Sequence, residues 1–288
     1  MRNVSALALG LGAVLVTTAL GAGVALAEDV AGKPVPGGIN FQRPVTPIAH
    51  EMLWMDDFLL VIITAITLFV TALLGYTVYR FRKEKNPTPA RFTHNAKLEV
   101  LWTAIPVLIL VVIAVPSLRL LFNQLDIPEP EVTIKATGYQ WYWGYEYPEH
   151  DISFEAIMLQ KDELEEYGYQ PDEYLLATDT KMVVPVDTNV HLLVTGADVI
   201  HNFAMPSFGL KTDAIPGRLN EAWFRAEETG VFFGQCSELC GINHAYMPIT
   251  IEVVSQEDYE AWVAEQVAAR EGGVSVAATD EAAEAVSR

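Results

Sequence analysis

Residues 132–147, VTIKATGYQWYWGYEY, set the fold class. β-branched and aromatic residues dominate this stretch, and both kinds favour strands. Runs of the same type follow, separated by Gly, Pro, Asp and Asn: KMVVPV (181–186), VHLLVTG (190–196), VIHNFAM (199–205), EAWFRA (221–226), GVFFGQ (230–235) and MPITIEVV (247–254). About seven short strands without helices between them predict an all-β sandwich or barrel.

Three parts of this region depart from the strand pattern. Residues 150–180 are acidic and irregular, and we interpret them as a surface excursion between strands. Residues 256–270 predict a terminal helix. Residues 271–288 are rich in Gly and Ala and lack large apolar anchors, so we expect a flexible tail.

Two apolar segments precede the strands. Residues 58–79 are free of charge over 22 positions, and residues 100–118 over 19. At about 1.5 Å per residue, each is long enough to cross a hydrocarbon core of roughly 30 Å. Pro106 and Pro116 interrupt helical hydrogen bonding in the second segment, so a neighbouring helix must accommodate the freed groups. We predict a transmembrane hairpin over 58–122, an external segment at 28–57, and a membrane partner.

The loop between the apolar segments is basic, with six Lys and Arg residues and one acid. The positive-inside bias therefore puts this loop in the cytoplasm and both flanking ends outside. Arg2, the apolar stretch from Ala6 and the small residues before Glu28 form a secretory signal over 1–27; a retained membrane helix is the alternative. We expect a multi-pass protein of a bacterial-type inner membrane, with the β-region in the periplasm.

Acidic residues concentrate beyond the hairpin. The chain has a formal net charge of −19, and from residue 123 onward 8 basic and 30 acidic residues leave a net charge of −22. This balance argues against nucleic acid as a partner, because a phosphate backbone needs Lys and Arg to neutralise it. A cationic partner fits better.

The only two cysteines lie in GQCSELCGINHAYM (234–247). Outside the cytoplasm a disulfide is the first expectation, but a bridge across a three-residue gap stabilises little. Cys236, Cys240, His244 and Met247 form a soft ligand set that favours copper. One copper would leave a cysteine surplus, whereas two coppers bridged by both sulfurs use all four residues.

Two bridged coppers need one more histidine from elsewhere in the chain. His201 is the best candidate, since it lies near the end of a predicted strand beside a turn. His150 lies in an acidic loop and His191 inside an apolar strand, and we interpret both as structural residues.

The strings GYQWYWGYEY, HNFAMPSFGLKTDAIPGR and GQCSELCGINHAYMP, following two membrane segments, resemble subunit II of haem-copper cytochrome c oxidases. The resemblance covers most of the chain from about residue 40 to residue 262. It implies a two-helix transmembrane hairpin and, over 123–270, a cupredoxin-like Greek-key β-barrel with a dinuclear copper centre, CuA. It also implies these ligands: bridging Cys236 and Cys240, terminal His201 and His244, and the weak axial ligands Met247 and the Glu238 carbonyl.

The resemblance also implies contacts with cytochrome c. Trp141 matches the residue where electrons enter, and Gln140 and Tyr142 match neighbours that help to align the carrier. Without the resemblance, core packing is the simpler interpretation of these aromatic residues. Three acids match the carrier-docking face, although a solvated surface is the alternative: Glu146, Glu155 and Asp198.

Two further acids have roles that the resemblance implies. The Glu238 carboxylate would bind a magnesium ion shared with subunit I. Glu99 matches the mouth of a proton pathway, although an acid at this position also suits the helix dipole.

The implied function is an electron relay. Electrons would pass from cytochrome c to subunit I, which reduces oxygen to water with proton pumping, and further oxidase subunits would complete the complex. The alternatives are a membrane-tethered copper chaperone, which should bind one copper, the copper domain of another respiratory reductase, and a quinol oxidase subunit, which would lack the copper ligands.

Overall fold

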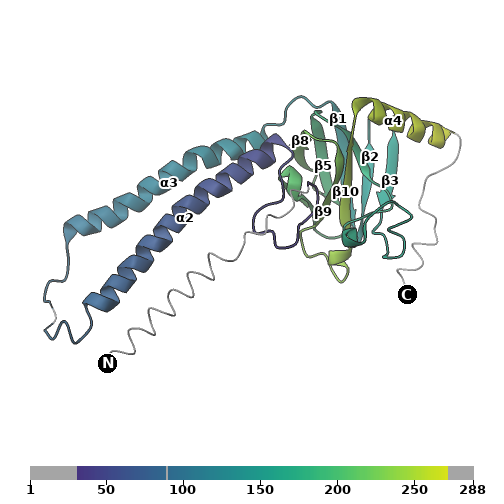
Figure 1. The fold of residues 1–288 in the computed structure, drawn as a ribbon. Coiled ribbons are helices and arrows are strands. Elements are labelled where there is room, and N and C mark those ends of the chain that lie inside the picture. Colours follow the sequence, from purple (N-terminus) through teal and green to yellow (C-terminus); the bar gives the residue numbers. More distant parts are fainter. Residues whose placement is uncertain (1–30, 89, 272–288) are drawn as a thin grey trace.

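The computed structural model describes residues 31–88 and 90–271. The predicted signal (1–27) and residues 272–288 of the predicted tail lie outside this part of the chain. Two long helices lead into a β-domain (Figure 1). The helices are α2 (Pro47–Arg80), α3 (Ala96–Leu125) and α4 (Gln256–Glu271). The strands are β1 (Val132–Tyr139), β2 (Tyr142–Tyr147), β3 (Ile152–Ala156), β4 (Met182–Pro185), β5 (Val190–Gly196), β6 (His201–Met205), β7 (Leu210–Ala214), β8 (Asn220–Phe224), β9 (Gly230–Cys236) and β10 (Pro248–Val254).

Helices α2 and α3 form the predicted hairpin. Both are long and apolar enough to cross a membrane, and the most apolar stretch of each helix is not buried against the rest of the protein. Each helix extends beyond the predicted span because polar caps lie further out: Thr46 accepts a hydrogen bond from the N–H of Ala49, and Asn95 accepts one from the N–H of Leu98. Pro106 and Pro116 lie inside α3 without ending it.

Polar contacts fix the hairpin to the β-domain. Asn123, near the end of α3, donates to both carboxylate oxygens of Glu51 in α2, at 3.0 and 2.9 Å. The indole of Trp223 in β8 donates to the Asn123 carbonyl at 3.0 Å, and the Thr46 hydroxyl donates to the Phe208 carbonyl at 2.8 Å. The ends of both helices that lie next to the β-domain are therefore joined to each other and to that domain.

The β-domain consists of two five-stranded sheets. Their strand orders are β3-β2-β1-β5-β8 and β4-β10-β9-β6-β7, with parallel pairing only in the β1–β5 and β4–β10 pairs among the described strands. Apolar side chains of both sheets meet in one core that includes Ile134, Trp143, Phe203, Phe232 and Ile251. The prediction of an all-β domain behind a two-helix hairpin is confirmed.

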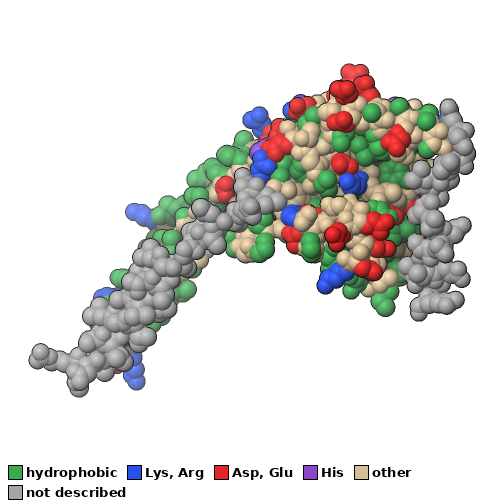
Figure 2. Space-filling view, turned by 45° about the vertical axis from the view of Figure 1, so that its right-hand side comes forward, with side chains coloured by type: hydrophobic (Ala, Val, Ile, Leu, Met, Phe, Trp, Pro, Cys, Tyr) green, Lys and Arg blue, Asp and Glu red, His purple; other side chains and the backbone are tan. Residues whose placement is uncertain are grey.

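The surface of the two parts differs. Figure 2 shows acidic side chains spread over the visible face of the β-domain and hydrophobic side chains along the visible part of the hairpin. This distribution agrees with the charge asymmetry of the sequence.

The strand prediction was wrong in detail. Residues 132–147 form two strands, β1 and β2, which pair antiparallel around a turn at Gln140 and Trp141. Strand β7 was not predicted. The described residues form ten strands rather than about seven.

The interpretation of residues 150–180 as an irregular surface excursion was also wrong. Strand β3 lies within them and pairs with β2. Beyond it, Leu159, Leu164, Tyr169 and Ala177 pack against Phe233 of β9 in a second buried cluster. The sequence pattern did not indicate this cluster, because acidic residues lie between its apolar positions and make the average composition of the region polar.

The C-terminal helix was predicted correctly. Helix α4 covers Gln256–Glu271, and its Trp262 packs on Tyr147 of β2 with ring centroids 5.1 Å apart. In Figure 1, α4 runs along the outside of the β-domain beside the β1–β3 strands.

Candidate metal centre

Strand pairing brings the first two candidate ligands together. His201 begins β6 and Cys236 ends β9, and these strands pair antiparallel with Phe203 opposite Cys236. The chain then forms a loop that carries Cys240 and His244 and returns to β10 at Met247 and Pro248. Residues 35 positions apart in sequence therefore share one end of the sheet, because β6 and β9 are neighbours.

The sulfur atoms gather in this loop. The Sγ atoms of Cys236 and Cys240 lie 3.8 Å apart and both cysteines are free and buried. Cys240 Sγ lies 3.5 Å from Met247 Sδ and 3.6 Å from His244 Nδ1. The Glu238 carbonyl accepts a hydrogen bond from Cys236 Sγ at 3.3 Å. All of these candidate ligands meet, and the two cysteines are not joined in a disulfide.

His201 completes a compact donor group. One of its ring nitrogens and the two cysteine Sγ atoms all lie within 4.8 Å of one another. The imidazole is fully buried, and its Nδ1 has no hydrogen-bond partner among the described residues. A buried polar atom without a partner is costly, so Nδ1 is the atom that a metal ion would satisfy. His244 is half-buried and lies beside the group, with its Nδ1 3.6 Å from Cys240 Sγ.

The two cysteine thiols have different pKa values because their surroundings differ. Burial alone would raise the pKa of Cys236, but the neighbouring His201 imidazole, more than any other group, lowers that pKa to about 7. Burial and the neighbouring Cys236 charge raise the pKa of Cys240 to about 12. The two sulfurs lie too close for both to ionise easily without a cation between them.

This donor set fits copper. Thiolate, thioether and imidazole are soft ligands that select copper over magnesium, calcium or manganese. The residues present therefore suit a copper centre.

Asp198 supports His201 in a way that the sequence prediction missed. Its carboxylate lies 2.8 Å from His201 Nε2 and also accepts hydrogen bonds from the N–H groups of Gln140 and Val199, at 2.8 and 2.6 Å. Asp198 was predicted only as part of a docking face. Its position three residues before His201 was the available signal, since histidine ligands commonly donate their second N–H to a carboxylate.

The aromatic residues of the β1–β2 hairpin divide into two kinds. Trp143 is fully buried, and its ring meets that of Phe203 edge-on at 5.2 Å. Trp141 is only half-buried and packs at the margin of the core. Core packing therefore explains Trp143 but not the exposed part of Trp141.

The other predicted site acids lie outside the donor group. Glu146 accepts a hydrogen bond from Lys135 at 2.7 Å, so its charge is partly neutralised. Glu155 lies beside Tyr142, where burial first and the Glu155 charge second raise the pKa of the tyrosine to about 12. Glu238 exposes its side chain while its carbonyl faces Cys236.

Glu99 lies in the first turn of α3. Its carboxylate accepts a hydrogen bond from the N–H of Asn95 at 3.2 Å, as an acid that caps a helix start does.

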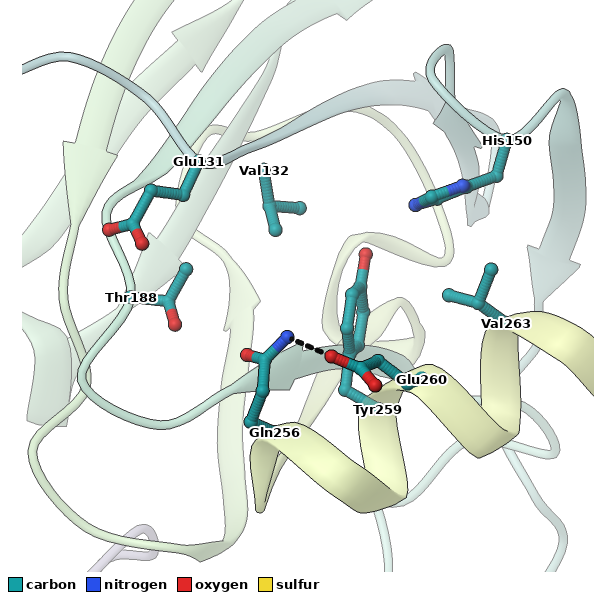
Figure 3. A pocket seen from close by; sticks show the side chains of 8 residues that line it. All are labelled: Glu131, Val132, His150, Thr188, Gln256, Tyr259, Glu260 and Val263. Atoms are coloured by element: carbon teal, nitrogen blue, oxygen red, sulfur yellow. Dashed lines mark hydrogen bonds between the residues drawn. The ribbon is translucent and has the colours of Figure 1, made fainter.

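The remaining histidines of the β-domain lie apart from the sulfurs. His191 contacts the Glu221 carboxylate at 3.0 Å, which agrees with a structural role. His150 lines a groove of about 320 Å³ at the Val132 end of β1 (Figure 3). In this groove Gln256 donates to Glu260 at 2.9 Å, and the Tyr259 ring lies between His150 and α4.

Comparisons with known proteins agree on one family. The family model described as "Cytochrome C oxidase subunit II, periplasmic domain" matches residues 132–254, and the corresponding "transmembrane domain" model matches residues 34–120. Cytochrome c oxidase subunit 2 of Cereibacter sphaeroides is 56% identical over 249 residues, which cover 82% of each chain. Probable cytochrome c oxidase subunit 2 of Rickettsia felis is 51% identical over 236 residues, 81% of this chain and 73% of the relative.

A solved structure gives a further match. It is the crystal structure of the periplasmic domain of subunit II of cytochrome oxidase from Bradyrhizobium japonicum, with 52% identity and a TM-score of 0.44. It covers 49% of this chain and 96% of that one. Since the two family models span both the hairpin and the β-domain, the chain belongs to the cytochrome c oxidase subunit II family, the membrane-anchored subunits of haem-copper oxidases whose periplasmic-domain family implies a copper centre.

Proposed function

We propose that this chain is the subunit at which electrons enter a cytochrome c oxidase. It accepts electrons from cytochrome c at a dinuclear copper centre and passes them to subunit I, which reduces oxygen to water with proton pumping. The observation that carries the proposal is the buried group of His201, Cys236 and Cys240, with two unjoined sulfurs 3.8 Å apart and an unpartnered imidazole nitrogen.

Six residues would hold the metal. Cys236 and Cys240 would bridge two copper ions, His201 and His244 would each bind one, and Met247 and the Glu238 carbonyl would bind weakly. When bound, the copper pair supplies reversible one-electron exchange. The distances from Cys240 to Met247 and His244, and from Cys236 to the Glu238 carbonyl, support this ligand set.

The chain's own groups prepare the centre. Two thiolates offset most of the positive charge of the metal, which lowers the cost of burying it. The Asp198 carboxylate can only accept a hydrogen bond, so His201 carries its proton on Nε2 and keeps the Nδ1 lone pair free. Both cysteines are buried from water. The assigned ligands leave no position for a substrate.

Cytochrome c would dock near Trp141, where a half-buried aromatic ring lies beside the ligand loop. The net charge of −22 beyond residue 123 would steer a basic carrier and speed its encounter in a salt-dependent way. Glu155 forms no ion pair within the described residues and can contribute its charge, whereas Lys135 offsets Glu146, and Asp198 is committed to His201. Asp198 therefore contributes to docking less than to the metal site.

The topology follows from the basic loop between α2 and α3. This loop would lie in the cytoplasm, so that the β-domain and both ends of the mature chain face the periplasm of a bacterial inner membrane. Subunit I and further oxidase subunits would pack against the apolar hairpin, alongside lipid. The exposed Glu238 carboxylate would bind magnesium together with subunit I, and Glu99, at the cytoplasmic end of α3, would lie at the mouth of a proton pathway.

Copper loading of the full chain in detergent tests the proposal. Metal analysis should give two coppers per chain, and paramagnetic resonance should show hyperfine splitting by two equivalent copper nuclei. Reduced cytochrome c should then remove this signal. A control variant, Cys240→Ser, should lose the two-nucleus pattern. One copper per wild-type chain, with single-nucleus splitting, would reject the dinuclear assignment and favour a chaperone.

A further inference from the structure

The turn between β1 and β2 is tied to the ligand loop through Gln140. Its backbone N–H donates to Asp198 at 2.8 Å, and its side-chain Nε2 donates to the carbonyl of Cys240 at 2.7 Å. Gln140 thus reaches both the acid that holds His201 and the backbone of a cysteine ligand. Gln140 itself is exposed, and its amide nitrogen is engaged with the ligand loop.

Gly241 forms the second contact between the turn and the loop. A Cβ atom at this position would lie 3.0 Å from Trp141 Cζ2, 3.4 Å from Trp141 Nε1 and 3.0 Å from Gln140 Nε2. Real Cβ contacts are rarely so short. The indole therefore lies directly against the backbone that follows Cys240, in a space that only a glycine leaves open.

No hydrogen bond of the indole itself fixes its position. Trp141 Nε1 is buried and has no hydrogen-bond partner among the described residues. Packing against Gly241 and the anchored Gln140 backbone must therefore hold the ring. If the Gln140 amide were lost, the turn would keep its bond to Asp198 but lose its hydrogen bond to the ligand loop.

We propose that Gln140 and Gly241 are positioning residues that hold the Trp141 indole against the ligand loop. The effect of this contact on electron transfer rests on the proposed function, because the rate of electron transfer falls steeply as donor and acceptor separate. The contact itself does not depend on copper, and it can be measured in the metal-free chain.

The main test is Gln140→Met, which keeps the length of the side chain and removes the amide. The measurement uses the metal-free full chain. The fluorescence contributed by Trp141 is obtained by subtracting the spectrum of the same protein carrying Trp141→Phe. For Gln140→Met this emission should shift to the red and become more accessible to a collisional quencher. Gln256→Met is the matched control, since it removes an amide hydrogen bond from α4 and should leave the Trp141 emission unchanged.

Kinetics of the assembled oxidase separate positioning from docking. For Gln140→Met the turnover at saturating cytochrome c should fall about fivefold or more, while KM stays within about twofold of the wild type and copper content is unchanged. A rise in KM alone would overturn the proposal in favour of a docking contact. Trp141 emission and quenching identical to the wild type would overturn it directly.

Gly241→Ala is the second variant. Gly241 has a φ of +127°, so alanine there adds backbone strain as well as a clash with the indole. Gly168→Ala is the matched control, because Gly168 has a φ of +81° with nothing within 4 Å of the added Cβ. Gly241→Ala should shift the Trp141 emission and Gly168→Ala should not; equal spectra for the two would show that the close contact is unimportant.

The experiments distinguish the two proposals. If the emission changes as expected but the chain binds one copper, the contact stands and the electron-relay function fails. If two coppers bind normally and the emission does not respond to Gln140→Met, the function stands and the positioning role fails.

Discussion

The Asp198 carboxylate lies 2.8 Å from Nε2 of His201, whereas Nδ1 of the same ring has no hydrogen-bond partner among the described residues. The same carboxylate accepts the backbone N–H of Gln140. One acid thereby fixes the tautomer of a candidate copper ligand and the start of the Trp141 turn.

Replacing Asp198 should weaken copper binding. Asp198→Ala leaves a fully buried imidazole N–H without an acceptor, and loss of such a partner typically lowers metal affinity about 10- to 100-fold. Asp198→Asn keeps an acceptor oxygen and should lose less. Competition against a chelator of known affinity, with the full chain in detergent, measures both. Asp172→Ala removes an exposed acid paired with Lys33 and serves as the control. Equal affinities for Asp198→Ala and the wild type would contradict the role given to Asp198.

Mild oxidation of the metal-free chain should abolish copper binding reversibly. The sulfurs of Cys236 and Cys240 lie 3.8 Å apart, so a small movement brings them to the roughly 2.0 Å of a disulfide. Diamide would accept the two hydrogens, and the joined sulfurs could no longer bridge metal. Thiol labelling with mass spectrometry should show both cysteines lost together, and a reducing agent should restore labelling and copper uptake. Normal copper loading of a chain shown to be oxidised would contradict the bridging assignment.

Trp141→Phe and Trp143→Phe should have different effects. Trp141 lies at the surface beside Gly241, so Trp141→Phe should slow oxidation of cytochrome c sharply while copper content and stability stay normal. Trp143 is fully buried, so Trp143→Phe should lower the free energy of unfolding by about 1–3 kcal/mol. Stopped-flow kinetics and urea unfolding measure the two effects. Unchanged carrier oxidation in Trp141→Phe would remove this residue from the electron route.

The sequence was most informative where chemistry is local. Cys236, Cys240, His244 and Met247 occupy twelve consecutive residues, so their ligand types and spacing could be interpreted without a fold. The hairpin was equally accessible, because an uncharged segment long enough to span a bilayer is a property of composition. Helix ends were missed, since the caps Thr46 and Asn95 lie outside the apolar segments.

Contacts between distant segments could not be predicted. Gln140 and Cys240 lie 100 residues apart and meet only because the β1–β2 turn and the ligand loop share one end of the domain. The second core cluster was hidden for a different reason. Leu159 and Leu164 are separated by charged residues, and only the structure shows that both face Phe233.

The region that was mistaken for a surface excursion gives a pH prediction. Asp179 accepts backbone hydrogen bonds from Ile157 and Thr180, both at 2.7 Å. Burial raises its pKa above the ordinary value of 3.8, and these hydrogen bonds oppose the rise only in part. Between the unfolded and folded pKa values the folded state binds more protons, so the contribution of Asp179 to stability falls as pH rises.

Asp179→Asn keeps the acceptor oxygen but cannot ionise. The variant should therefore gain stability relative to the wild type as pH rises from about 3 to about 6. Urea midpoints of the full chain in detergent, followed by tryptophan fluorescence across this range, measure the difference. Asp172→Asn should show the opposite trend, because a hydrogen bond from Lys33 lowers the pKa of Asp172 and its contribution is lost as pH falls. A pH-independent difference between Asp179→Asn and the wild type would mean that the carboxylate of Asp179 is not buried in the folded chain.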